Sequence, residues 1–149
     1  MRVVLQRVSR ASVDVAGERV AQIGRGYLLL VGVGAGDPTG EEPRLAKKIA
    51  TLRVLADGDG RMNLALAEVD GEVLVVSQFT LYGDIRKGRR PSWTRAEDPA
   101  IAARRVEAFA ACLEGLGVRV ARGIFGADMQ VDLESDGPVT LVIDAADLP

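Results

Sequence analysis

A short polar segment, Ser77-Gln78-Phe79-Thr80, has the residue types for acyl-transfer chemistry. It follows the apolar run 72–76, a predicted strand, so hydroxyls, an amide and unpaired backbone N–H groups gather at one strand end. The N–H groups of Phe79 and Thr80 are suited to hold a developing oxyanion. A nucleophilic Thr80 would need an adjacent base, and the segment carries none. In a structural alternative, the Ser77 and Thr80 hydroxyls only cap a turn.

The dipeptide Gly137-Pro138 is a second candidate, and it offers only backbone. Apolar residues alternate over 129–133 and 139–143, so both flanks are predicted to be strands. Pro138 cannot donate a ladder hydrogen bond, and Gly137 has no side chain to pack. Asp-Gly-Pro is typical of an ordinary turn. In the other interpretation the dipeptide presents its carbonyl groups to a ligand, and these residues alone leave both open.

A basic segment with one aromatic residue is the third candidate. It surrounds Trp93 with the cationic side chains of Arg86, Lys87, Arg89, Arg90 and Arg95. Such residues suit phosphate contacts and stacking on an unpaired base. A solvated loop is the alternative. The formal net charge is −2, so nucleic-acid affinity would have to depend on this local patch.

Composition removes several classes of function. The chain of 149 residues has no histidine, which excludes Ser-His-Asp and Cys-His catalysis and zinc sites that need imidazole. Its one cysteine, Cys112, lies among apolar residues, is predicted to be packing, and fits a reducing cytoplasm. Gln6 and Arg7 interrupt the first apolar run, so no signal peptide is expected. No stretch approaches the ~20 apolar residues of a membrane helix.

Two glycine-rich segments imitate binding loops. Segment 32–37, Gly-Val-Gly-Ala-Gly-Asp, resembles a dinucleotide loop, but Asp37 occupies the third glycine position and would repel a pyrophosphate. Segment 57–68 imitates a calcium loop, but Arg61 and Met62 stand where an oxygen ligand and a glycine belong. We expect segment 32–37 to be a flexible loop and segment 57–68 to be a turn that binds no metal.

Periodicity predicts the elements that position these candidates. Strands are predicted over 3–8, 11–15, 18–23, 27–33, 72–76 and 118–120, and before and after Gly137-Pro138. One helix is predicted from a capping box at Thr39–Glu42, and another from Asp98 to Gly115. The stretch 82–97 is predicted to be a loop. The result is one mixed α/β domain over residues 1–149, a largely antiparallel β-sheet or barrel with packed helices.

Two of these segments together resemble a known family. Ser77-Gln-Phe-Thr-Leu81 and Asp136-Gly-Pro-Val-Thr140 are similar to the two signature motifs of the D-aminoacyl-tRNA deacylases, at matching separation. Shorter matches follow in order at 6–8, 62–63, 75–76, 90–92 and 127–131. The resemblance implies a deacylase-type fold without metal or organic cofactor. It also implies hydrolysis of the ester joining a D-amino acid, or mischarged glycine, to the terminal adenosine of tRNA.

The resemblance further implies a homodimer with active sites at the subunit interface. Gly137-Pro138 would be a cis dipeptide inserted into the partner's pocket, where its carbonyls reject L-residues and so provide chiral proofreading. Arg7 and Met129 resemble the neighbours that hold it. One departure is Ser135, where the family usually has asparagine, and this puts the tie across the Gly-Pro segment in doubt.

The implied catalytic residues are those of the first motif: Ser77, Gln78, Phe79 and Thr80. The Phe79 and Thr80 N–H groups would hold the oxyanion while the substrate's own 2′-OH positions or activates water. Trp93 stands where phenylalanine is common in the family, which still permits stacking in the tRNA-binding segment. Two rival functions are a nucleotide-binding oxidoreductase that uses segment 32–36 and a non-catalytic RNA-binding module that uses segment 86–95.

Overall fold

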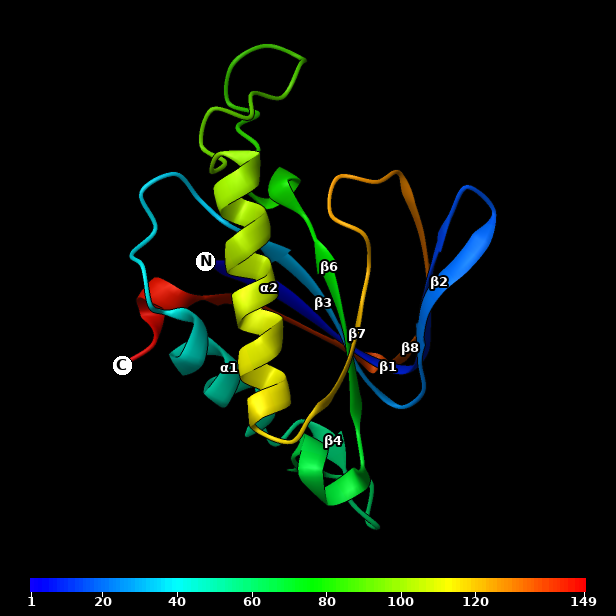
Figure 1. Ribbon diagram of the computed structural model, residues 1–149. Coiled ribbons are helices and arrows are strands. Elements are labelled where there is room, and N and C mark those ends of the chain that lie inside the picture. Colours follow the sequence, from blue (N-terminus) through cyan, green and yellow to red (C-terminus); the bar gives the residue numbers. More distant parts are fainter.

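The computed structural model describes residues 1–149 and has the predicted order of strands and helices (Figure 1). Its strands are β1 (Arg2–Val15), β2 (Glu18–Ile23), β3 (Gly26–Gly32), β4 (Leu55–Ala56), β5 (Met62–Leu64), β6 (Glu72–Ser77), β7 (Arg119–Arg122) and β8 (Met129–Asp144). Its helices are α1 (Glu42–Ala50) and α2 (Pro99–Gly115), with 3-10 turns η1 (Leu66–Val69), η2 (Phe79–Tyr82) and η3 (Ala145–Asp147). None of the helices has the length and apolar content to cross a membrane.

Strand β1 organises the main sheet, because three strands pair with it. β2, β3 and β8 are all antiparallel to β1. The pairs β3–β6 and β6–β7 are parallel, and parallel neighbours need a crossover connection. Helix α1 lies in the first crossover and α2 in the second. The nearly closed, barrel-like sheet with two packed helices confirms the predicted mixed α/β fold, with more parallel pairing than the sequence suggested (Figure 1).

Strand β3 is buried on both of its faces, which explains its continuous apolar run. Tyr27, Leu29 and Val31 belong to the main core beneath the two helices, together with Phe109 of α2. Leu28 points the other way, into a second core that β1 and β2 help to enclose. The C-terminal ends of β3 and β6 are therefore held from two sides, and this is where the candidate site lies.

Helix α1 begins later than the sequence predicted. A capping box at Thr39 would put Pro43 at the fourth helical position, where its missing N–H costs an intrahelical hydrogen bond. The helix instead begins at Glu42, which places Pro43 in the first turn, and no side chain caps it. The Glu42 carboxylate accepts from Arg105 of α2 at 2.5 Å. The predicted cap of α2 is confirmed, since Asp98 accepts two N–H groups of its first turn.

Candidate active site

An apolar cavity of about 260 Å³ lies where the Ser77–Thr80 segment follows β6. Its wall consists of Val31, Val33, Val76, Ser77, Gln78, Phe79, Ala102, Val106, Phe125, Gly126, Ala127, Met129 and Val131. No side chain in this wall is ionisable, so the cavity offers no side-chain acid or base of its own. Ala102 and Val106 have the spacing of apolar residues on one face of a helix, which indicates core packing, and residues 125–127 carry no periodic signal. These parts of the wall were therefore not predicted.

The Phe79 and Thr80 backbone groups are presented at the start of η2. The first N–H groups of a helix have no hydrogen-bond partner within that helix. The Phe79 and Thr80 N–H groups also make none of the backbone hydrogen bonds found in loops and turns. The Gln78 N–H donates to the Val31 carbonyl at 2.8 Å, which ties the turn to β3. The Thr80 hydroxyl accepts from the Gln78 amide, and no side chain caps η2. The interpretation in which Ser77 and Thr80 only cap a turn is therefore wrong.

Gly137 and Pro138 lie on a bulge within β8 and not in a turn between two strands. Ser135 and Thr140, on either side of the bulge, both pair with β1. Four residues of β8 lie between them opposite a single residue of β1, so three extra residues are pushed out of the ladder. Both Gly137 and Pro138 are exposed, and the bond between them is cis, as predicted.

Arg7 is the residue of β1 opposite the bulge, and its buried guanidinium holds the bulge. Nε donates to the Asp136 carbonyl at 2.8 Å and lies 3.2 Å from the Asp136 carboxylate, while Nη1 donates to the Val54 carbonyl at 2.6 Å. A Cβ on Gly137 would lie 2.9 Å from Nη2, and its φ of +132° also favours glycine. The Ser135 side chain makes no hydrogen bond, and the bulge is tied to β1 through Arg7.

Met129, the second predicted neighbour of the dipeptide, lies in the cavity wall and not beside the bulge of its own chain. It begins β8 and packs against Gly123. Ser135 is six positions further along β8, about 20 Å along an extended strand. Within one chain, Met129 is therefore not a neighbour of Gly137-Pro138.

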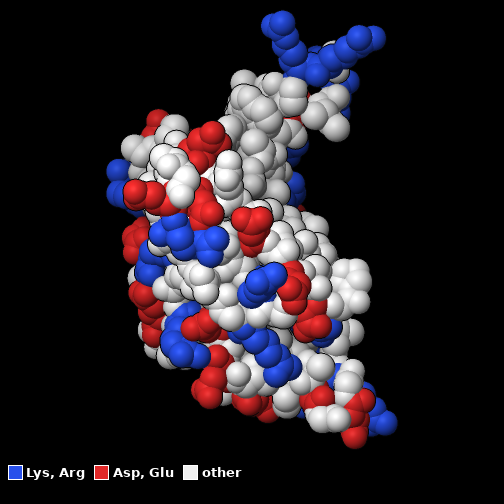
Figure 2. All heavy atoms as spheres, turned by 90° about the vertical axis from the view of Figure 1, so that its right-hand side faces the viewer, with Lys and Arg blue, Asp and Glu red and all other residues white.

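The basic residues lie on a loop that projects from the body of the molecule. Figure 1 shows this segment rising beyond the first turn of α2, and Figure 2 shows Lys and Arg side chains gathered at its tip. Arg86 pairs with Asp84 at 2.5 Å, and its hydrogen bond holds the pKa of that carboxyl well below the usual range. Lys87, Arg89 and Arg90 are exposed and form no ion pair. Arg95, later in the same loop, is also exposed and without an ion pair, so these four side chains are its free positive charges.

Trp93 joins this loop to the candidate site. Its ring meets Phe79 edge to face, with the centroids 5.2 Å apart and the planes at 77°. It also lies over Gly83, where a Cβ would come within 2.7 Å of the indole. Both aromatic rings are partly exposed, at 42% for Trp93 and 53% for Phe79. Phe79, which lines the cavity, therefore contacts the basic loop through Trp93.

Neither glycine-rich loop has the structure of the binding site that it imitates. The Asp57 carboxylate accepts from the N–H groups of Asp59 and Arg61, as expected of the predicted turn. Segment 32–37 does not open a helix, because α1 begins only at Glu42.

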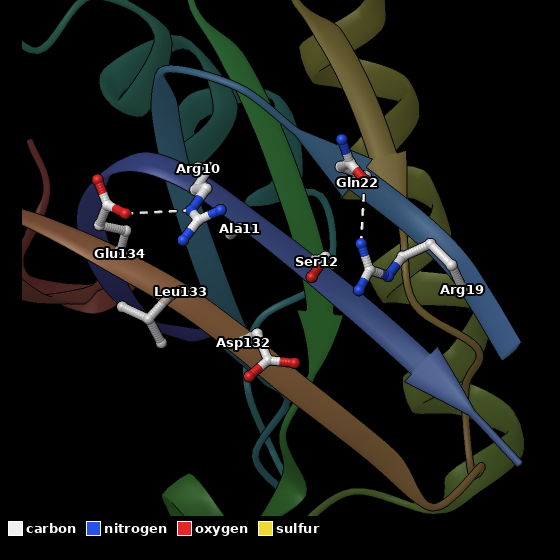
Figure 3. A pocket seen from close by; sticks show the side chains of 8 residues that line it. All are labelled: Arg10, Ala11, Ser12, Arg19, Gln22, Asp132, Leu133 and Glu134. Atoms are coloured by element: carbon white, nitrogen blue, oxygen red, sulfur yellow. Dashed lines mark hydrogen bonds and ion pairs between the residues drawn. The ribbon is translucent and has the colours of Figure 1, made fainter. Parts of the chain in front are cut away.

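A larger hollow, of about 340 Å³, lies over β1, β2 and β8 (Figure 3). Its cations are already engaged: Arg10 pairs with Glu134 at 3.1 Å, and Arg19 donates to Gln22 at 3.0 Å. Asp132 adds a second carboxylate to the wall. We therefore assign the chemistry to the smaller cavity beside Phe79.

Comparisons with known proteins give one consistent result. Residues 4–144 match the family model described as D-Tyr-tRNA(Tyr) deacylase. The D-aminoacyl-tRNA deacylases of Roseiflexus castenholzii and Chloroflexus aurantiacus are 57% and 58% identical, covering 98% and 99% of this chain and 93% and 92% of theirs.

Solved structures agree in fold. A structure described as c-Myc DNA Unwinding Element Binding Protein superposes with a TM-score of 0.89 at 37% identity, over 97% of this chain and 98% of that chain. A probable eukaryotic D-amino acid tRNA deacylase has the same fold, with a TM-score of 0.83 at 19% identity, over 95% and 97% of the two chains.

The role of Arg7 can be tested on stability. Arg7→Ala removes charge-assisted hydrogen bonds to two carbonyls, and we expect the free energy of unfolding to fall by about 3 kcal/mol. The matched control is Arg10→Ala, on the same strand, whose exposed pair with Glu134 should contribute little. Urea unfolding measures both variants, and equal losses would contradict a specific role for Arg7.

Proposed function

The chain belongs to the D-aminoacyl-tRNA deacylase family and is a hydrolase of D-aminoacyl-tRNA; from this premise we propose how its residues act. The Phe79 and Thr80 N–H groups hold the oxyanion that forms when water attacks the ester carbonyl. Ser77 and Gln78 connect these groups to β6 and line the cavity beside them. The substrate's neighbouring 2′-OH positions or activates the water. The observation that carries this proposal is the absence of any ionisable side chain from the cavity wall.

Electrostatics favour this arrangement. Two N–H dipoles fixed at the start of η2 stabilise negative charge that develops on the carbonyl oxygen, and the apolar wall keeps the local dielectric low. A lost oxyanion donor typically costs ~2.7–4 kcal/mol of transition-state stabilisation. The Thr80 hydroxyl accepts from Gln78 and has no base beside it, so it is not the nucleophile.

Chiral selection is the part assigned to Gly137 and Pro138, and it needs a second chain. The bulge is exposed, and its β-strand carries it about 20 Å from Met129 in the cavity of the same chain. In a homodimer, each bulge enters the partner's cavity, and its carbonyls face the amino acid's α-carbon. An L side chain would collide with them, whereas a D side chain or the hydrogen of glycine would not. Mischarged glycyl-tRNA is then also a substrate.

The basic loop binds the tRNA. Lys87, Arg89 and Arg90 contact phosphates near the acceptor end, and Arg86 donates to a phosphate through Nη1, which Asp84 does not use. The exposed Trp93 ring stacks on an unpaired base next to the terminal adenosine, since it already contacts Phe79 at the cavity mouth. The single free cysteine fits a cytoplasmic site of action, where charged tRNA is found.

The direct test offers D-tyrosyl-tRNA and L-tyrosyl-tRNA to the protein in parallel and measures release of free tyrosine. We expect the D-ester to be hydrolysed and the L-ester to remain at its uncatalysed rate. Equal rates would refute chiral selection. Binding without release of amino acid would favour the RNA-binding module instead.

The amide mechanism predicts that Thr80→Ala remains active, because the substitution keeps the backbone N–H. We expect kcat for D-tyrosyl-tRNA within about threefold of wild type, well short of the 10²–10³ lost with an oxyanion donor. Single-turnover assays with saturating enzyme measure this. A fall to the uncatalysed rate would show that the hydroxyl takes part in the chemistry.

A further inference from the structure

The glycine segment that imitates a dinucleotide loop has a role that the proposed mechanism leaves unassigned. Tyr82, the last residue of η2, is 9% exposed, and its ring lies against this segment. A Cβ on Gly34 would come within 2.3 Å of the ring, and one on Gly32 within 3.2 Å of the ring and 2.9 Å of the Gln78 carbonyl. The glycines are therefore required by close packing of the turn that carries Phe79 and Thr80.

A hydrogen bond fixes the ring in this gap. The Tyr82 hydroxyl donates to Oδ2 of Asp37 at 2.8 Å, and the same oxygen accepts from the Gly34 N–H at 2.6 Å. Burial and the hydrogen bond to Asp37 raise the pKa of the Tyr82 hydroxyl, so it remains a donor at neutral pH. Burial alone would raise the pKa of Asp37, but hydrogen bonds from the Met1 amine, Gly34 and Tyr82 outweigh it and hold that pKa below its usual value.

The other side of the turn is held by Arg2. Its guanidinium lies 5.3 Å from the centroid of the Tyr82 ring and donates to the Leu81 carbonyl at 3.2 Å. Arg2 is itself fixed by two hydrogen bonds of 2.9 Å to Asp144 at the end of β8. The C-terminal end of η2 is thus clamped between the glycine segment and Arg2, whereas its N-terminal end faces the cavity.

We propose that Tyr82 is a positioning residue of the reaction, with Asp37 as its anchor. It touches no substrate. It sets the orientation of η2, and thereby the direction in which the Phe79 and Thr80 N–H groups point. This proposal rests on the oxyanion role of those two groups. Because a misplacement of about 1 Å can cost about 10²-fold in rate, a loosened turn lowers kcat while substrate binding is kept.

The test compares the chain's two tyrosines. Tyr82→Phe keeps the ring and removes only the hydroxyl. Tyr27→Phe makes the same change in the main core, where that hydroxyl donates to the Leu52 carbonyl at 3.3 Å. We expect Tyr82→Phe to lower kcat about tenfold with KM changed less than about twofold, and Tyr27→Phe to leave both unchanged. An unchanged kcat in Tyr82→Phe, or an equal loss in both variants, would overturn the proposal.

Hydrogen exchange separates this proposal from the proposed function, because it requires no substrate. The Leu81 and Gly83 N–H groups close the turn on the Gln78 and Thr80 carbonyls. Exchange at these two amides should accelerate in Tyr82→Phe and not in Tyr27→Phe. If exchange accelerates in Tyr82→Phe but the wild-type protein hydrolyses no D-aminoacyl-tRNA, the proposed function is refuted and the positioning role of Tyr82 is not. Unchanged exchange would refute the positioning role.

Asp37 supplies an independent pair of variants. All its donors converge on Oδ2, so Asp37→Asn can present its amide oxygen to Tyr82. We expect Asp37→Asn to keep kcat within about threefold, and Asp37→Ala to lose at least as much as Tyr82→Phe. If Asp37→Asn and Asp37→Ala lower kcat equally, the reaction depends on the charge of Asp37 and not on its hydrogen bond to Tyr82.

Discussion

The hydrogen bond from the buried Arg7 guanidinium to the Asp136 carbonyl is the interaction on which the proposed site most depends. Arg7 lies on β1, the strand shared by β2, β3 and β8, so the bulge is tied to the most extensively paired part of the sheet. Three extra residues in a long strand would otherwise be free to move. A flexible bulge could not reject one enantiomer, because selection by collision requires that the colliding carbonyls do not yield.

The two halves of the proposed site share one design, in which backbone groups act and side chains elsewhere fix their direction. The oxyanion donors on η2 depend on Tyr82 and Arg2, and the carbonyls of the bulge depend on Arg7. This arrangement suits a chain with no histidine. It also suits a substrate that brings its own 2′-OH, because the protein then needs to supply position, apolar surroundings and two dipoles.

Local patterns in the sequence predicted much of the fold and pointed to the two segments of the proposed site. Ser77–Thr80 and Gly137–Pro138 could be found because each is a short run beside a periodic strand. Long-range packing could not be read in this way. Nothing in segment 32–37 indicates that its glycines receive the Tyr82 ring, or that Asp37 accepts from the Tyr82 hydroxyl 45 residues away. The predicted capping box at Thr39 failed because it ignored how Pro43 restricts the helix start.

We propose that one chain's bulge completes its partner's cavity, and mixed dimers of two variants distinguish this arrangement from one in which each bulge serves its own cavity. Gly137→Ala should displace the bulge carbonyls and admit L-tyrosyl-tRNA, whereas Thr80→Pro lacks an oxyanion N–H and should be inactive. When Gly137→Ala is exchanged into dimers with a large excess of Thr80→Pro, every working cavity faces an unaltered bulge. If each bulge enters the partner's cavity, L-hydrolysis per Gly137→Ala chain falls toward zero while D-hydrolysis is retained. L-hydrolysis that stays constant per Gly137→Ala chain would show instead that each bulge serves its own cavity.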